Sequence, residues 1–141
     1  MATWKKFEDI EAWKKGRELS QAVYKITKSN SLSSDYDLSR QMKRSSGSIM
    51  DNIAEGYERG GTKEFIYFLS ISKGSNAELR SQLYRCLDQE YISHDAFNEY
   101  YNLTIEISKL ISGIVSYLKS KNFKGYKFHE DPGVYKPTKD K

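Results

Sequence analysis

Six cationic side chains are the residues of this chain best suited to bind a ligand. They lie on two stretches, with Lys14, Lys15 and Arg17 on the first and Arg40, Lys43 and Arg44 on the second. Arg40 and Arg44 are four residues apart, so they share one face if this stretch is helical. Guanidinium groups match phosphate oxygens in charge and geometry, and exposed members of the 11 tyrosines could stack on bases. From these residues alone a solvated charged face is the favoured interpretation, and the alternative is that the six cations form a nucleic-acid-binding surface.

The distribution of charge favours the same region. The formal net charge is +4. Residues 1–61 carry 11 Lys and Arg against 9 Asp and Glu, residues 62–121 carry 7 against 7, and residues 122–141 carry 5 against 3. The positive surplus therefore lies in the first half of the chain and at its end, where it can neutralise phosphates. Residues 62–121 are therefore expected to contribute no net positive charge to such a surface.

A polar stripe follows the second cationic group. Its members are spaced four and three apart and are Gln41, Ser45, Ser48, Asn52 and Glu55. The stripe lies about one residue step from the apolar stripe of the same stretch, so Asn52 and Glu55 are expected to be half buried. A buried carboxylate needs a cation or hydrogen-bond donors. We therefore predict that Glu55 pairs with an arginine or lysine of another helix or subunit, in a structural polar network with Asn52. The alternative is a polar contact with a ligand.

Small residues interrupt two of the helical patterns. Residues 45–48 read Ser-Ser-Gly-Ser, and Ser70, Ser72, Gly74 and Ser75 form a matching patch. A glycine inside a helix costs about 1 kcal/mol relative to alanine, so these residues need a reason. The prediction is that the two helices approach each other closely here, and the alternative is a groove for a ligand or a partner helix.

Catalytic chemistry finds little support. The two histidines, His94 and His129, do not form the Glu-x-x-His pairs of di-metal carboxylate bundles. The Gly-Gly-Thr-Lys stretch at 60–63 lacks the preceding strand and leading glycine of a phosphate loop. Cys86 falls within a helical pattern and is expected in the core. We therefore expect no enzyme activity, no catalytic residue, no metal and no cofactor. An enzyme with a groove near Asn52 and Glu55 is the weakest interpretation.

Four amphipathic helices must position these residues. Apolar residues recur at helical spacing over about 9–28, 35–59, 62–89 and 93–121, with no sustained period of two. The stretch Ser34-Asp35-Tyr36-Asp37 is expected to cap the second helix and to place acidic residues in its first turn, and Gly60-Gly61 to end it. Thr62 and Ser93 are the expected caps of the third and fourth helices. Short links between long helices predict an all-α, antiparallel up-down-up-down four-helix bundle.

The bundle domain is expected to span residues 1–121, and residues 122–141, rich in Lys, Gly and Pro, to form a flexible basic tail. No apolar run reaches the roughly 20 residues of a membrane span, and the first residues, which no apolar run follows, are not expected to act as a signal peptide. We expect a cytoplasmic protein without membrane contact.

Three segments resemble a bacterial four-helix-bundle family first noted as intervening-sequence proteins of large-subunit rRNA genes. Residues 38–56 read Leu-Ser-Arg-Gln-Met-Lys-Arg-Ser-Ser-Gly-Ser-Ile-Met-Asp-Asn-Ile-Ala-Glu-Gly, and their last five residues are specific to the family. Phe-Glu-Asp-Ile-Glu-Ala-Trp at 7–13 resembles its N-terminal signature. Phe-Ile-Tyr-Phe-Leu-Ser-Ile-Ser-Lys-Gly-Ser-Asn-Ala-Glu-Leu at 65–79 resembles its third-helix motif. The similarity spans about residues 7–118.

The resemblance implies more than the residue pattern does. The family includes relatives of the accessory variability protein of diversity-generating retroelements, a basic pentameric ring that binds nucleic acid and reverse transcriptase. The resemblance therefore implies that this chain forms a homo-oligomer with five-fold symmetry and has no known catalytic residues. Together these points favour a homo-oligomeric accessory protein that binds RNA or DNA, with a reverse transcriptase as a possible partner. The alternative is a structural or protein-interaction scaffold that binds no nucleic acid.

Overall fold

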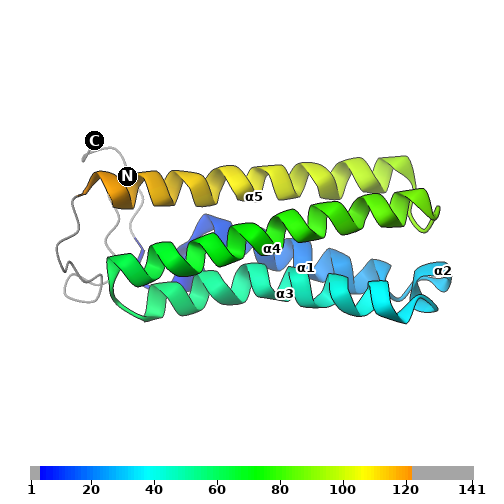
Figure 1. Cartoon of the computed structure of the whole chain (residues 1–141), viewed down its shortest axis with the longest axis horizontal. Helices are drawn as coiled ribbons and strands as arrows, with labels where there is room; N and C mark the ends of the chain where they lie inside the picture. The colour runs from blue at the N-terminus through cyan, green and yellow to red at the C-terminus, as the bar shows by residue number, and fades with distance from the viewer. Residues whose placement is uncertain (1–3, 122–141) are drawn as a thin grey trace.

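The computed structural model describes residues 4–121 of the chain. A short 3₁₀ turn, η1 (Phe7–Asp9), is followed by the helices α1 (Glu11–Ile26), α2 (Asn30–Ser33), α3 (Tyr36–Glu58), α4 (Thr62–Asp88) and α5 (His94–Ser120). No β-strand occurs in this part of the chain, which confirms the prediction of an all-α protein. Four of the helices are long and pack side by side, and α2 lies at the end of the bundle where α1 leads into α3 (Figure 1).

Contacts between helices show the direction of α3 relative to α4 and which helices are neighbours. Along α3 and α4, Ser48 meets Ser75, whereas the earlier residue Met42 meets the later residue Cys86. These two helices therefore run in opposite directions, as the colour gradient of Figure 1 also shows. The chain contacts place α1 beside α3 and α5, and α4 beside α3 and α5. Each long helix thus has two long neighbours.

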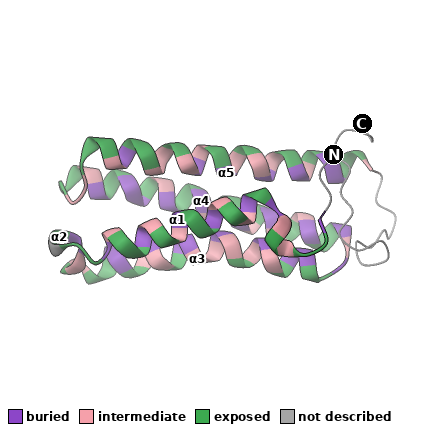
Figure 2. Ribbon diagram, turned by 180° about the vertical axis from the view of Figure 1, so that it is seen from behind, coloured by how far each residue is buried: buried purple, intermediate pink, exposed green. Residues whose placement is uncertain are grey.

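The core lies where the apolar stripes of the four long helices meet. Its fully buried side chains include Leu19, Met42, Phe65, Leu83 and Ile107, with contributions from every long helix. In Figure 2 buried residues recur along each long helix and alternate with exposed ones, as expected of amphipathic helices. Cys86 belongs to the same core, as the sequence predicts. Burying these stripes supplies the main drive for the helices to associate.

The helix ends follow local chemistry, with two departures from the prediction. Asp35 and Ser93 cap α3 and α5 by accepting the N–H groups of Leu38 and Ala96, at 3.2 and 3.1 Å. Gly60 follows the last turn of α3 and has a φ of 84°, a left-handed conformation that suits glycine and ends the helix. Thr62 is not the cap of α4: the two-glycine link is so short that Gly61 takes the cap position and Thr62 is the first, buried, helical residue.

The second departure concerns the link after α1. The predicted polar break at 29–31 contains part of a further short helix, α2, and α1 ends at Ile26, not at residue 28. The hydroxyls of Thr27 and Ser29 donate to the carbonyls of Tyr24 and Ile26, at 3.0 and 2.7 Å. Such local bonds compete with a continuing helix, so the chain turns here.

The small residues of α3 and α4 mark a close approach, as predicted. The hydroxyls of Ser48 and Ser75 are 2.8 Å apart, and the Ser72 hydroxyl donates to the Ile49 carbonyl at 2.7 Å. A side chain reaching the backbone of the facing helix requires that the helices lie close together. The two helices are also close at Gly56, where an added Cβ would lie 2.7 Å from the Cβ of Phe68.

The predicted tail, residues 122–141, lies outside the described residues. Within residues 4–121, no helix has both the length and the apolar character to cross a membrane.

Candidate nucleic-acid interface

A polar hollow lies at the end of the bundle where α1, α2 and α3 meet. Its volume is about 210 Å³, and its lining residues are Thr27, Ser33, Tyr36, Ser39, Arg40 and Lys43. Four of these six residues carry hydroxyl groups and the other two carry positive charge. The structure thus places two of the three predicted cations of α3 at one concave site.

Hydrogen bonds hold the walls of the hollow. The Ser39 hydroxyl donates to the Leu32 carbonyl at 2.7 Å, which ties α3 to α2. The Asp35 carboxylate caps α3 through one oxygen and accepts the Tyr91 hydroxyl through the other, at 2.9 Å. Tyr91 lies in the link between α4 and α5, so three separate segments converge here. The hydrogen bond to Asp35 raises the pKa of the Tyr91 hydroxyl, because Tyr91 donates it only when protonated.

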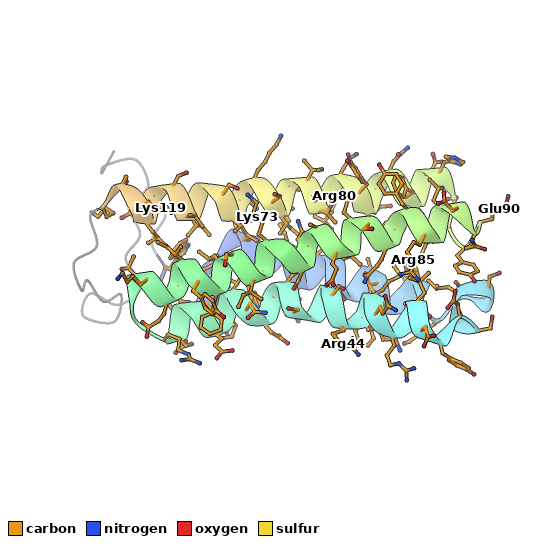
Figure 3. The ribbon with its side chains drawn as sticks, viewed as in Figure 1. Arg44, Lys73, Arg80, Arg85, Glu90 and Lys119 are labelled. Atoms are coloured by element: carbon orange, nitrogen blue, oxygen red, sulfur yellow. The ribbon has the colours of Figure 1, made fainter. Side chains whose placement is uncertain are left out.

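The cations of α3 differ in their surroundings. Arg40 is exposed and forms a 3.5 Å ion pair with Asp37, one turn earlier on the same helix. Lys43 is half buried, and its Nζ lies 5.5 Å from the centre of the Tyr24 ring on α1. Arg44 is exposed on α3 (Figure 3) and makes no ion pair within residues 4–121. A surface pair such as Arg40–Asp37 is worth about 0–1 kcal/mol, so a phosphate can compete with it.

The predicted cations of α1 do not form a single second group. Lys15 is turned toward α5, where its Nζ lies 3.7 Å from Glu106 and 3.8 Å from Glu18. Arg17 lies 5.9 Å from the centre of the Trp13 ring. Lys14 and Arg17 are exposed. Lys15 is partly buried and faces α5, so of this group only Lys14 and Arg17 are exposed.

The predicted polar network contains Asn52 but not Glu55. The Asn52 amide donates to the carbonyl and the hydroxyl of Ser48, both at 2.9 Å, and Ser48 in turn meets Ser75. Glu55 pairs with an arginine, as predicted, but with Arg59 of the same helix at 2.7 Å. The Glu55 side chain is 50% exposed, which agrees with the expected half burial. The partner differs from the prediction, because Arg59 lies four residues along the same stretch and not on another helix.

Several features of the surface were missed from the sequence. Tyr36 and Arg40 are four residues apart, as are Ser39 and Lys43, and this spacing could have joined them in one site. Thr27 and Ser33 belong to other segments, and no spacing rule would have found them. Figure 3 also shows Lys73, Arg80 and Lys119 along α4 and α5, the region that the charge count had set aside. Lys73 and Lys119 border an apolar groove of about 280 Å³ between these helices.

The residues that the structure describes contain neither a cluster of metal-binding side chains nor a readily ionised thiol. No group of three or more metal-binding side chains occurs within residues 4–121. Burial raises the pKa of the Cys86 thiol to about 11, which disfavours the reactive thiolate. His94 is exposed at the start of α5, and His129 lies outside the described residues. The geometry is suited to binding an anionic partner at the hollow.

A family model described as "23S rRNA-intervening sequence protein" matches residues 8–113, which is most of the chain. The chain belongs to this family. That finding confirms the resemblance seen in the three motifs, whereas the relation to retroelement accessory proteins stays a prediction. The 23S rRNA-intervening sequence family thus includes a member whose α1–α3 end carries a cationic, hydroxyl-lined hollow.

A solved structure supports the fold of this family member. It is a protein of unknown function from the S23 ribosomal protein family of Bacteroides thetaiotaomicron, with a TM-score of 0.68 and 24% sequence identity. The similarity covers 74% of this chain and 95% of the other. A comparison with curated proteins found no match.

Proposed function

We propose that this member of the 23S rRNA-intervening sequence family is a non-catalytic, homo-oligomeric nucleic-acid-binding accessory protein. The observation that carries the proposal is the hollow at the α1–α3 end, where Arg40 and Lys43 lie beside hydroxyl groups and exposed Arg44 follows on α3. Cationic and hydroxyl side chains are those that contact phosphate and sugar in nucleic-acid complexes. Lys14 and Arg17 extend the same role along α1.

Self-association, with five copies as the family resemblance implies, is part of the proposal. Gly74 lies inside α4, and an added Cβ there would meet nothing within 4 Å. This glycine costs about 1 kcal/mol relative to alanine, and no contact within the protomer requires it. A close helix contact between copies would require it. Repeating a weakly basic surface around a ring would also concentrate its field.

A salt titration of binding tests the proposal. Duplex and single-stranded RNA and DNA are titrated with the wild type and with an Arg40→Glu/Arg44→Glu variant. Binding should weaken steeply with salt, with a log–log slope of roughly 0.7–0.9 for each neutralised phosphate. The variant should bind all sequences more weakly and with a smaller slope, because the lost contacts are to the backbone.

A matched control makes the same change of charge elsewhere. Lys63 on α4 and Lys109 on α5 are exposed and make no ion pair among the described residues, so Lys63→Glu/Lys109→Glu should affect binding less. Light scattering should give about five times the 16.4 kDa chain mass. An intact oligomer that binds no nucleic acid at about 50 mM salt would favour the scaffold alternative. A reverse transcriptase as partner stays a prediction.

A further inference from the structure

Two exposed tyrosines flank the cationic hollow. Tyr36 lines it and is 74% exposed, and Tyr24 is 48% exposed on the neighbouring helix α1. Lys43 lies between them, since it lines the hollow with Tyr36 and its Nζ lies over the Tyr24 ring. An aromatic ring left open to water beside arginine and lysine is the arrangement that proteins use to stack bases along a charged groove.

Tyr36 differs from the other exposed tyrosines of the bundle. The Tyr84 ring packs against Phe97 and Tyr101, with centres 4.9 and 6.0 Å away, and the Tyr67 ring meets Phe68 at 5.2 Å. Among residues 4–121, the Tyr36 side chain makes no ring contact and no hydrogen bond, whereas the Tyr24 ring already has the Lys43 ammonium 5.5 Å from its centre. Packing within the protomer therefore does not account for the Tyr36 ring.

We infer that the hollow takes single-stranded nucleic acid, with a base stacked on Tyr36 and the adjoining phosphate held by Arg40 and Lys43. This inference rests on the proposed function and adds to it the form of the nucleic acid. Arg40 lies one helical turn after Tyr36, and Lys43 one turn after Arg40, so all three lie on the same side of α3. A base and its own phosphate can then be met together.

The requirement for a single strand follows from the stacking. In a duplex the faces of the bases are covered by their neighbours, so a protein side chain can reach a face only where bases are unstacked. The phosphates remain accessible in both forms. Contacts to phosphate alone would leave Tyr36 without a partner, whereas a single strand can contact the cations and the ring at once.

The hydroxyls of the hollow fit the sugar and base of such a strand. Those of Thr27 and Ser39 donate to the carbonyls of Tyr24 and Leu32, at 3.0 and 2.7 Å. Each hydroxyl has one proton to donate, so these two now offer only their lone pairs as acceptors. Acceptors repel a second phosphate and suit an amino or hydroxyl group. The cations therefore bind the phosphate, and this wall is left for the nucleoside.

The test compares strands and variants on the intact oligomer. The probes are a labelled, unstructured oligouridine, the matching oligodeoxythymidine and a duplex of the same length. Tyr36→Ala should weaken binding of both single strands by roughly 5- to 150-fold, the range for losing one stacked base, with little change for the duplex. Tyr36→Phe, which keeps the ring, should bind like the wild type. Tyr67→Ala removes another exposed tyrosine, 60% exposed on α4, and should have no effect.

Each other outcome overturns the inference in a recognisable way. Equal binding of both single strands by the wild type and Tyr36→Ala, with weaker binding by Arg40→Glu/Arg44→Glu, would leave the proposed function standing and refute the stacking. Failure of the wild type to bind any probe would remove both. A Tyr36→Ala variant that changes the oligomer mass and loses all probes equally would place Tyr36 in a contact between copies instead.

Discussion

Replacing Gly56 with alanine should destabilise the bundle, whereas the same replacement at Gly47 should stabilise it. Both glycines lie on α3. An added Cβ at Gly56 would lie 2.7 Å from the Cβ of Phe68 and 3.0 Å from Cδ1 of Phe65, whereas at Gly47 it would meet nothing within 4 Å. The two substitutions therefore make the same chemical change in opposite surroundings.

The magnitude follows from which atom is in the way. Carbon atoms attract best at about 3.5–4.0 Å, and the Phe68 Cβ is bonded directly to the backbone, so rotating the side chain cannot relieve the clash. α3 and α4 must separate, and overpacking of this kind costs about 1–3 kcal/mol. Alanine recovers up to about 1 kcal/mol of helix propensity, and less at Gly56, which lies in the last turn. The expected changes are a loss of about 1–2 kcal/mol for Gly56→Ala and a gain of about 0.5–1 kcal/mol for Gly47→Ala.

Thermal unfolding followed by circular dichroism measures the difference. At about 4 °C per kcal/mol for a chain of this length, the two melting midpoints should differ by roughly 6–12 °C. Both variants and the wild type are compared at one protomer concentration, because association raises apparent stability. Equal shifts for the two variants would show that α3 and α4 are not in close contact at Gly56. A loss of stability at Gly47, together with a smaller oligomer, would place that glycine between copies.

Three further predictions concern the seam, the surface and the core. Ser48→Leu or Ser75→Leu should overpack the contact between α3 and α4, lower the free energy of unfolding by about 1–3 kcal/mol and lower the melting midpoint. Unchanged midpoints in both variants would show that the two helices do not pack closely at these serines. Glu55→Ala should lower the free energy of unfolding by no more than the 0–1 kcal/mol of an exposed ion pair, because Arg59 stays solvated. A larger decrease in a denaturant titration would mean that a partner buries Glu55. Cys86 should resist a thiol reagent near pH 8 until the protein unfolds. Burial raises the pKa of its thiol from 9.0 to about 11. The contribution of this thiol to the free energy of unfolding is therefore fully present below pH 9 and should be lost as the pH rises from 9 to 11. Rapid labelling of the folded protein would contradict this.

The helices could be predicted from the sequence because their signals are local. The apolar stripes recur at helical spacing, and Asp35 and Ser93 precede them as ordinary caps. The close approach of α3 and α4 was also predictable, because Ser48 and Ser75 interrupt two helices that short links bring together. These signals lie within a few residues of the feature that they specify.

The hollow could not be predicted in the same way because it is built from three segments. Arg40 and Lys43 were recognisable on α3, but Thr27 and Ser33 join them only through the turn that the hydroxyls of Thr27 and Ser29 impose. The partner of Lys15 was equally hidden, since Glu106 is more than 90 residues away along the chain. For Glu55 the spacing of the stripe predicted half burial, and the side chain is 50% exposed, but the spacing could not show that its partner is Arg59 and not a residue of another helix.

The double hydrogen bond of Asp35 has a consequence for any ligand of the hollow. One carboxylate holds both the start of α3 and the link before α5, and Ser39 holds α2 to α3. The backbone around Tyr36 and Arg40 is therefore already ordered before a ligand arrives. Binding then has to immobilise only side chains, at about 0.5–1.5 kcal/mol each, and pays no folding entropy. More of the free energy of the contacts at the hollow is therefore available as binding affinity.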